Sequence, residues 1–309
     1  MKPSILVGGQ AVIEGVMMRV PGAYATAVRD PEGEIHIQKK EFQSITERSN
    51  FWKKPIFRGM ASLYEAMKMG MATLNYSADI AMPEEGEQSK LGEFFSTVFA
   101  IGLAITLFMV APMWITTKLM NIEKEALWFN LASGGFRIAF FVIYLLAISM
   151  LKDVRRLFQY HGAEHRVVYN FESGKDVNVD NAQSFPTQHP RCGTSFLFIV
   201  LLSAILVFAI VDTIVMYFLG TISLPIRLLA HLPLIPLVSG VGYELIKLSA
   251  KSDSIFFSIL KQPGLWLQNI TTKQPENDMV EVSITALKEA FGDRYEDMVG
   301  QEYTAEAIG

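Results

Sequence analysis

The sequence predicts an α-helical membrane protein with about four transmembrane helices and a small cytoplasmic α+β portion built from the N-terminal and C-terminal segments. Half of the 309 residues are hydrophobic and only 19% are charged. The apolar residues are concentrated in a few runs, each long enough to cross a hydrocarbon core of about 30 Å. The flanking regions are more polar and carry strand and amphipathic-helix patterns, which places them outside the bilayer.

Residues 1–90 are expected to form a cytoplasmic β-hairpin followed by an amphipathic helix. The turn sequence DPEG separates two partly alternating runs within 23–42, as is typical of a hairpin. The stretch GGQAVIEGVMMR at 8–19 is expected to be a strand–turn element, because its glycines permit tight turns or close backbone approach. A polar segment at 83–90 is expected to be a linker.

An amphipathic helix is predicted at 59–82, where apolar residues recur at helical spacing. The residues that define its apolar face are Leu63, Met67, Met71 and Leu74. Methionine fills irregular gaps in cores, so we expect this face to pack on a neighbouring element. The alternative is that the face lies on the bilayer.

The transmembrane domain is expected to occupy 91–250. Its four predicted spans are 94–117, 132–151, 195–219 and 226–246. Arg137 lies near one end of the second span and is expected to extend to the interface. The fourth span contains two prolines, which predicts either a kinked crossing or a re-entrant segment. Asp212 and Arg227 both fall near the outer face, where a structural ion pair is expected.

The orientation follows from the distribution of lysine and arginine. The segment 152–194 carries six of these residues, more than the other loops between spans. Cytoplasmic loops are enriched in basic residues, so this segment and both termini are expected in the cytoplasm. Residues 251–309 are then a cytoplasmic C-terminal segment, whose amphipathic helix is expected to pack on the N-terminal portion. A thiol in this compartment stays reduced.

The 152–194 segment carries a candidate metal site. His161, Glu164 and His165 fall within a 100° arc if they lie on a helix that continues from the second span. The order H-x-x-E-H is that of inverzincin metalloproteases, in which both histidines bind zinc and the glutamate activates water. His189 and Cys192, the only cysteine, follow closely in the sequence. Imidazole and thiolate are preferred zinc ligands, so a divalent metal, best matched by zinc, is expected.

Two coordination states remain open. If all three histidines and Cys192 bind, the site is closed and structural. If only three of the four bind, a fourth position is open and catalysis becomes feasible. Glu164 favours the open state as a catalytic base, although it could instead orient an imidazole.

Three further residues are candidates for an accessory role or for ligation. Glu244 lies at the cytoplasmic end of the fourth span, where an acidic group indicates either a functional site or an ion pair with Lys247 or Arg156. Glu14 and Arg19 belong to the glycine-containing stretch at 8–19 and could face a polar ligand or the metal loop.

Six stretches together resemble the YqhQ family of bacterial multipass membrane proteins: GGQAVIEGVMMR, FRGMASLYEA, YHGAEHR, HPRCGTSF, GYELIK and PENDMVEVSITAL. The resemblance covers almost the whole chain. It implies a bacterial plasma (inner) membrane location and a metal-dependent enzyme. The metal role carries over to the three histidines, Glu164 and Cys192. The resemblance implies no substrate.

The leading functional hypothesis is a zinc-dependent membrane enzyme, a hydrolase of a peptide, lipid head group or ester, with Glu164 as general base. The alternative is a non-enzymatic assembly or scaffold protein with a structural zinc site. The lipid bilayer and an unknown membrane or protein partner are the expected partners. A net charge of −4 argues against nucleic acid. Transport ranks third, because no pair of matching broken helices indicates inverted repeats.

Overall fold

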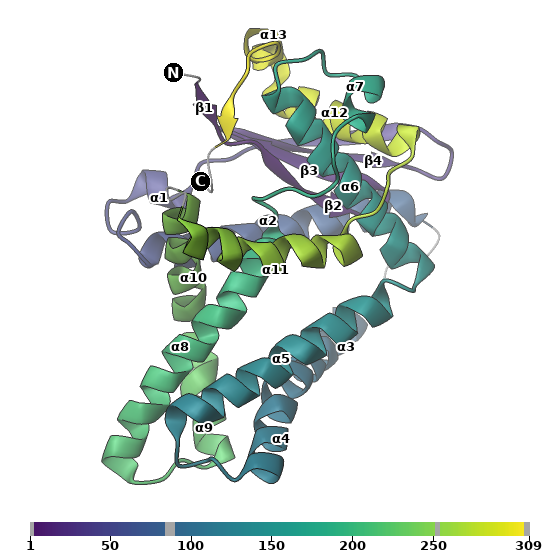
Figure 1. Cartoon of the computed structure of the whole chain (residues 1–309). Helices are drawn as coiled ribbons and strands as arrows, with labels where there is room; N and C mark the ends of the chain where they lie inside the picture. The colour runs from purple at the N-terminus through teal and green to yellow at the C-terminus, as the bar shows by residue number, and fades with distance from the viewer. Residues whose placement is uncertain (1–2, 84–89, 251–253, 306–309) are drawn as a thin grey trace.

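The chain folds into an extramembrane domain and a bundle of long apolar helices (Figure 1). The computed structural model describes residues 3–83, 90–250 and 254–305. Its mostly helical architecture, with four long apolar helices and an N-terminal antiparallel four-stranded sheet, confirms the predicted fold class. The linker predicted at 83–90 lies, except for its ends, outside the described residues.

The extramembrane domain is organised around an antiparallel meander. Its strands pair in chain order and are β2 (Gly8–Val12), β3 (Gly15–Val20), β4 (Ala23–Arg29) and β5 (Ile35–Glu41). The predicted hairpin and strand–turn element are therefore both confirmed. Two short parallel strands, β1 (Ser4–Ile5) and β6 (Thr304–Ala305), bring the two ends of the described chain together.

Alternation along β3 gives the sheet two buried faces. Val16, Met18 and Val20 join the main core with α6 (Lys152–Glu172) and α12 (Asn277–Phe291). Met17 instead packs with Met69 of α2 (Phe57–Ala81) on the opposite face. The C-terminal amphipathic helix thus packs on the N-terminal sheet, as the sequence predicts. The shorter helical elements are α1 (Ile45–Arg48), α7 (Val179–Gln183), η4 (Gly292–Arg294) and α13 (Tyr295–Met298).

The Met-containing face of α2 is more exposed than the sequence predicts. Met67 and Met71 are 66% and 56% exposed, whereas Met69 on the opposite side is buried. Besides Glu65 and Met69, the buried stripe of α2 consists of small residues, including Ala61 and Thr73, which allow the helix to approach the sheet and the bundle. The expectation that Met67 and Met71 form a core face is therefore wrong.

Four helical stretches among the described residues are long and apolar enough to cross a membrane: Phe94–Met120, Ala126–Ile148, Gly193–Leu219 and Leu224–Ser249. The first comprises α3 (Lys90–Ile105) from Phe94 onward, η2 (Thr106–Val110) and α4 (Ala111–Met120). The next two are α5 (Ala126–Ile148) and α8 (Gly193–Leu219). The fourth runs through three prolines, Pro225, Pro233 and Pro236, as α9 (Leu224–His231), η3 (Leu232–Leu234) and α10 (Ile235–Ala250).

Two expectations about the second span are corrected. Arg137 does not extend to the interface but is buried, and its Nε donates to the Phe108 carbonyl at 2.8 Å. Pro112 has no N–H that could donate to the Phe108 carbonyl four residues earlier, so Arg137 supplies the missing hydrogen bond. The helix also does not continue into α6, because Leu151 is extended at ψ 135° and redirects the chain onto the sheet.

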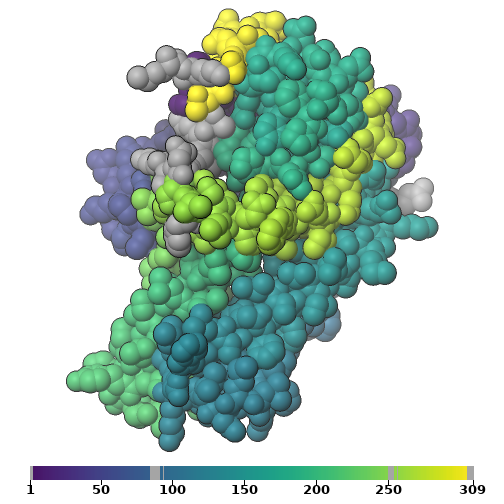
Figure 2. Space-filling view, viewed as in Figure 1, coloured from purple at the N-terminus to yellow at the C-terminus, as the bar shows by residue number. Residues whose placement is uncertain are grey.

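Helix α11 (Ile255–Thr271) connects the two parts of the molecule. It packs on α8 and α5 and lies across the junction between the bundle and the domain (Figure 2). Its C-terminal end therefore lies next to the beginning of α8, where the candidate site is found.

Candidate metal centre

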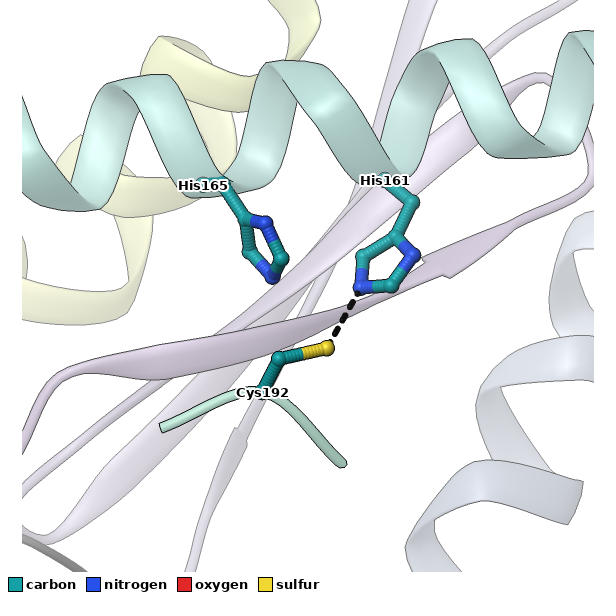
Figure 3. Close-up of side chains that lie close together, drawn as sticks. All are labelled: His161, His165 and Cys192. Atoms are coloured by element: carbon teal, nitrogen blue, oxygen red, sulfur yellow. Dashed lines mark hydrogen bonds between the residues drawn. The ribbon is translucent and has the colours of Figure 1, made fainter. Parts of the chain in front are cut away.

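Three potential ligands converge between α6 and the start of α8. One ligand atom from each of His161, His165 and Cys192 lies within 4.8 Å of the others. The two imidazoles extend from one side of α6 toward the thiol (Figure 3), as residues four apart on a helix must. The Cys192 sulfur lies 3.2 Å from Nε2 of His161. This arrangement confirms that three of the four predicted ligands form a candidate metal-binding group.

Backbone carbonyls fix the orientation of both histidines. Nδ1 of His161 lies 2.8 Å from the Thr271 carbonyl at the end of α11. Nδ1 of His165 is similarly hydrogen-bonded to the Thr187 carbonyl. A carbonyl only accepts hydrogen bonds, so each Nδ1 carries the proton and each Nε2 keeps its lone pair. Outer contacts of this kind are typical of histidines that bind metals.

Cys192 is the N-cap of α8, the third candidate span. Its sulfur accepts a hydrogen bond from the Thr194 backbone N–H at 3.4 Å. A cysteine binds metal as the thiolate. Two imidazole Nε2 atoms and one thiolate therefore form a donor set that fits zinc.

The Glu164 carboxyl group lies beside the two histidines. Its Oε2 atom is 3.4 Å from Nε2 of His165, and its side chain is 6% exposed. Burial raises the pKa of Glu164 to about 7, although a hydrogen bond from the Gly9 backbone favours the ionised form. A Cβ at Gly9 would lie 2.9 Å from Cγ of Glu164. The glycine thus allows β2 to approach this carboxyl group closely.

His189 lies next to the three grouped ligands and has different partners. Its ring centroid is 5.5 Å from that of His165, and its Nε2 is 3.9 Å from a Glu172 oxygen. The side chain of Gln268 on α11 is hydrogen-bonded to both the N–H and the carbonyl of His189, at 2.7 and 2.8 Å. Burial lowers the pKa of His189 to about 4, so its imidazole is neutral near pH 7.

A cavity of about 260 Å³ adjoins the centre. The metal-binding group, Glu164 and His189 line one part of it. Strands β2 and β3 and helix α2 supply the remainder, including Gln10, Arg19 and Met69. Arg19 thus lines the same cavity as the metal-binding group. Its guanidinium carbon lies 4.4 Å from the centre of the Phe42 ring.

The other two accessory candidates form ion pairs away from this cavity. Glu14 accepts a hydrogen bond from Arg156 Nη2 at 2.6 Å, in the turn between β2 and β3. Glu244 accepts one from Arg58 Nε at 2.7 Å. Arg156 and Lys247 were the partners considered for Glu244, so the pairing with Arg58 is a correction.

Sequence reasoning missed the groups that hold the ligands in place. They are the Thr187 and Thr271 carbonyls and the side chains of Gln268 and Glu172. Backbone carbonyls carry no residue-specific signal. Among these groups, the Gln268 side chain is fully buried near the end of α11, three residues before Thr271.

The fold and the site define a multipass membrane protein with a candidate His/His/Cys metal centre in its extramembrane domain. The chain belongs to the family described as "Protein of unknown function (DUF1385)", whose model matches residues 54–293. It is also 31% identical over 297 residues to "Uncharacterized protein YqhQ" of Bacillus subtilis (strain 168), covering 91% of each chain. These matches confirm the resemblance inferred from the sequence motifs. No solved structure matches the chain.

Proposed function

We propose that the protein is a zinc-dependent hydrolase of a bacterial membrane. His161, His165 and Cys192 hold the metal, and Glu164 is the general base. The observation that carries the proposal is the convergence of three donor atoms within 4.8 Å beside a cavity that Glu164 also lines. Three protein ligands next to an accessible cavity are typical of catalytic zinc sites, whereas structural sites have four.

The chemical roles divide between the metal and the protein. Zinc would supply a Lewis acid that polarises a substrate carbonyl or phosphoryl group and lowers the pKa of water. The two backbone carbonyls hold the imidazoles with Nε2 toward the centre. Glu164 accepts a proton from water in the cavity and returns it to the leaving group.

The position of the centre supports action at the membrane surface. Cys192 immediately precedes a candidate span at Gly193–Leu219. The site is therefore within reach of head groups, and a peptide, lipid head group or ester remains the substrate class. The six basic residues of 152–194 support placing this domain, and with it both termini, on the cytoplasmic side.

The alternative is a structural zinc site in an assembly or scaffold protein. The observation that favours it is the position of His189, whose ring is 5.5 Å from that of His165. A change in its side-chain orientation could make it a fourth ligand. Its contacts with Glu172 and Gln268 favour the role of a neighbour that shapes the cavity wall.

The hydrolase proposal is tested with purified, zinc-loaded full-length protein and a panel of fluorogenic esters, peptides and phosphodiesters. Glu164→Gln is expected to keep zinc and lose at least about 100-fold in turnover, the contribution typical of a general base. Glu14→Gln is the matched control, since Glu14 bonds Arg156 and not the metal group. Turnover that survives in Glu164→Gln contradicts the assigned role.

A further inference from the structure

Helix α2 carries an apolar stripe on the side that faces away from the sheet. We propose that this stripe lies in the head-group boundary of the bilayer, so that α2 is an in-plane membrane helix. The stripe, called here the α2 stripe, has as its main members Leu63, Tyr64, Met67, Met71 and Leu74. At 100° per residue these positions fall within an arc of about 100°, and no charged residue of α2 lies in that arc.

The large side chains of the α2 stripe are exposed. Tyr64, Met67 and Met71 are 59%, 66% and 56% exposed. Met69, on the opposite side of the helix, is buried and packs with Met17 of the sheet. Single apolar side chains on a surface are ordinary, whereas a contiguous apolar stripe marks contact with a membrane or with another protein.

The beginning of α2 is fixed to one end of the fourth candidate span. Arg58 Nε donates a hydrogen bond to Glu244 of α10 at 2.7 Å. A Cβ at Gly59 would lie 2.6 Å from Cβ of Tyr243, so the glycine lets α2 touch α10 directly. Glu244 is in the last turns of the span Leu224–Ser249, and the ends of a span lie at the membrane boundary.

The other end of α2 is close in sequence to the first candidate span. Helix α2 ends at Ala81, and only residues 82–93 separate it from the span that begins at Phe94. One end of α2 is therefore joined to a span by packing and the other by a short length of chain. A helix of 25 residues, about 37 Å long, that is held in this way runs along the membrane surface.

The position of the sheet directs the α2 stripe toward the membrane. Helices α6 and α12 pack on one face of the sheet, and α2 packs on the other. Figure 1 shows that α2 lies on the side of the sheet that faces the bundle. The stripe is opposite the sheet, so it faces the region that the bilayer occupies around the bundle. Amphipathic helices with this placement bury their apolar face in the boundary between head groups and acyl chains.

Helix α11 has a similar exposed face at the same junction, which supports the bilayer as the occupant. Ile255, Ile259 and Trp266 fall within an arc of about 40° and are all exposed. Helix α11 packs on α8 and α5 of the bundle. Tryptophan is enriched at membrane–water interfaces. Two helices with exposed apolar faces at one junction are accounted for by a single lipid boundary.

This placement brings the metal cavity close to the bilayer. The opposite side of α2 contributes Ser62, Ala66 and Met69 to the cavity that adjoins the metal centre. The cavity is therefore separated from the lipid boundary by the width of one helix. The inference does not depend on the proposed hydrolase activity.

The test measures the surroundings of the α2 stripe in full-length protein reconstituted into vesicles of phosphatidylethanolamine and phosphatidylglycerol. A nitroxide spin label is attached to Met71→Cys. Electron paramagnetic resonance then measures its collisions with oxygen, which enters the bilayer, and with a polar nickel complex, which stays in water. Collisions with the nickel complex are expected to be at least about threefold fewer than in the control, because polar solutes are excluded from hydrocarbon. Collisions with oxygen are expected to increase.

Glu289→Cys is the matched control, because Glu289 is exposed on α12, which packs on the opposite face of the sheet. Cys192 is buried, and labelling of the unaltered protein measures its contribution. Equal collisions with the nickel complex at positions 71 and 289 would place the stripe in water and overturn the proposal. Shielding of position 71 from both reagents would also overturn it, since another protein or a second copy of the chain would then cover the stripe.

Discussion

The extramembrane domain and the membrane bundle each contain a polar cluster with histidine, and the two clusters differ in what their polar atoms contact. In the domain, His161 and His165 bond backbone carbonyls through Nδ1 and direct Nε2 toward Cys192 and the cavity. In the bundle, Nε2 of His231 instead contacts Asp212 at 2.9 Å. The first cluster presents metal-binding atoms to a cavity, whereas the second pairs Nε2 of His231 with a carboxylate and leaves its Nδ1 without a hydrogen-bond partner among the described residues.

The bundle cluster connects neighbouring spans through hydrogen bonds and an ion pair. Asp212 also accepts a hydrogen bond from Asn130 at 2.7 Å and pairs with Arg227 at 3.5 Å, which confirms the expected ion pair. The His231 ring stacks on Phe208 with centroids 4.0 Å apart. An ionisable residue inside a membrane suggests a functional site, but these contacts join three different spans around one carboxylate. Comparison of the two clusters therefore shows that burial of histidine alone does not identify a site.

The largest expected effect is the loss of metal from Cys192→Ser. The thiolate is a direct ligand in this account, so its removal should weaken zinc binding by more than the roughly 100-fold that loss of an outer partner costs. Zinc content after dialysis against a chelator measures this. Full zinc retention in the variant would show that the sulfur at the start of α8 is not a ligand.

Asp212→Ala is expected to destabilise the protein by about 3–5 kcal/mol, because it leaves the Arg227 cation buried without its partner. Zinc content should not change, since the two clusters lie in different parts of the molecule. Thermal unfolding in detergent, combined with metal analysis, checks both statements. A loss of zinc from folded Asp212→Ala protein would contradict the separation of the two clusters.

Glu164→Gln should change the pH dependence of stability in the metal-free protein. The pKa of Glu164 is about 7 in the folded protein, against 4.5 for a free, solvent-exposed glutamate. The folded state therefore binds more protons between about pH 4.5 and 7, and this group makes stability fall as pH rises through that window. Glutamine cannot ionise, so the variant is expected to gain up to about 3 kcal/mol at pH 8 and little at pH 4.5.

His189 contributes the opposite pH dependence of stability, because burial lowers its pKa, whereas burial raises that of Glu164. Its pKa is about 4 when folded against 6.5 otherwise, so stability from this group rises as pH increases from about 4 to 6.5. The two effects partly cancel in the unaltered protein. Melting temperatures of Glu164→Gln should therefore rise with pH across this range more steeply than those of the unaltered protein, and parallel curves would contradict the raised pKa of Glu164. A melting temperature of Glu164→Gln that does not rise between about pH 4 and 6.5 would contradict the lowered pKa of His189.

Gln268→Ala is expected to have the smallest effect. It leaves the N–H and the carbonyl of His189 without their partner, at a cost of about 1–3 kcal/mol. Because this loop leads into Cys192, zinc affinity is expected to fall about tenfold. Gln188→Ala is the control, since the Gln188 side chain donates an exposed hydrogen bond to Asn269, and the substitution keeps the backbone carbonyl that accepts from Tyr169. Equal effects in the two variants would remove the positioning role of Gln268.

The sequence predicted what depends on local patterns. Runs of apolar residues predicted the four spans, and the i, i+4 spacing placed His161 beside His165. Long-range partners were not predictable, because the carbonyl of Thr271 and the arginine that bonds Glu244 lie 110 and 186 residues away from the groups they contact. The break at Leu151 was also missed, since neither proline nor glycine marks it.

The central claim is that the metal centre has three protein ligands and an accessible fourth position. Zinc-edge X-ray absorption of the purified protein, compared with that of His189→Ala, tests it most directly. The account predicts one sulfur, two imidazoles and one non-imidazole light atom around zinc, with the same spectrum in the variant. One sulfur and three imidazoles in the unaltered protein, with one imidazole lost in His189→Ala, would contradict it and establish a closed structural site.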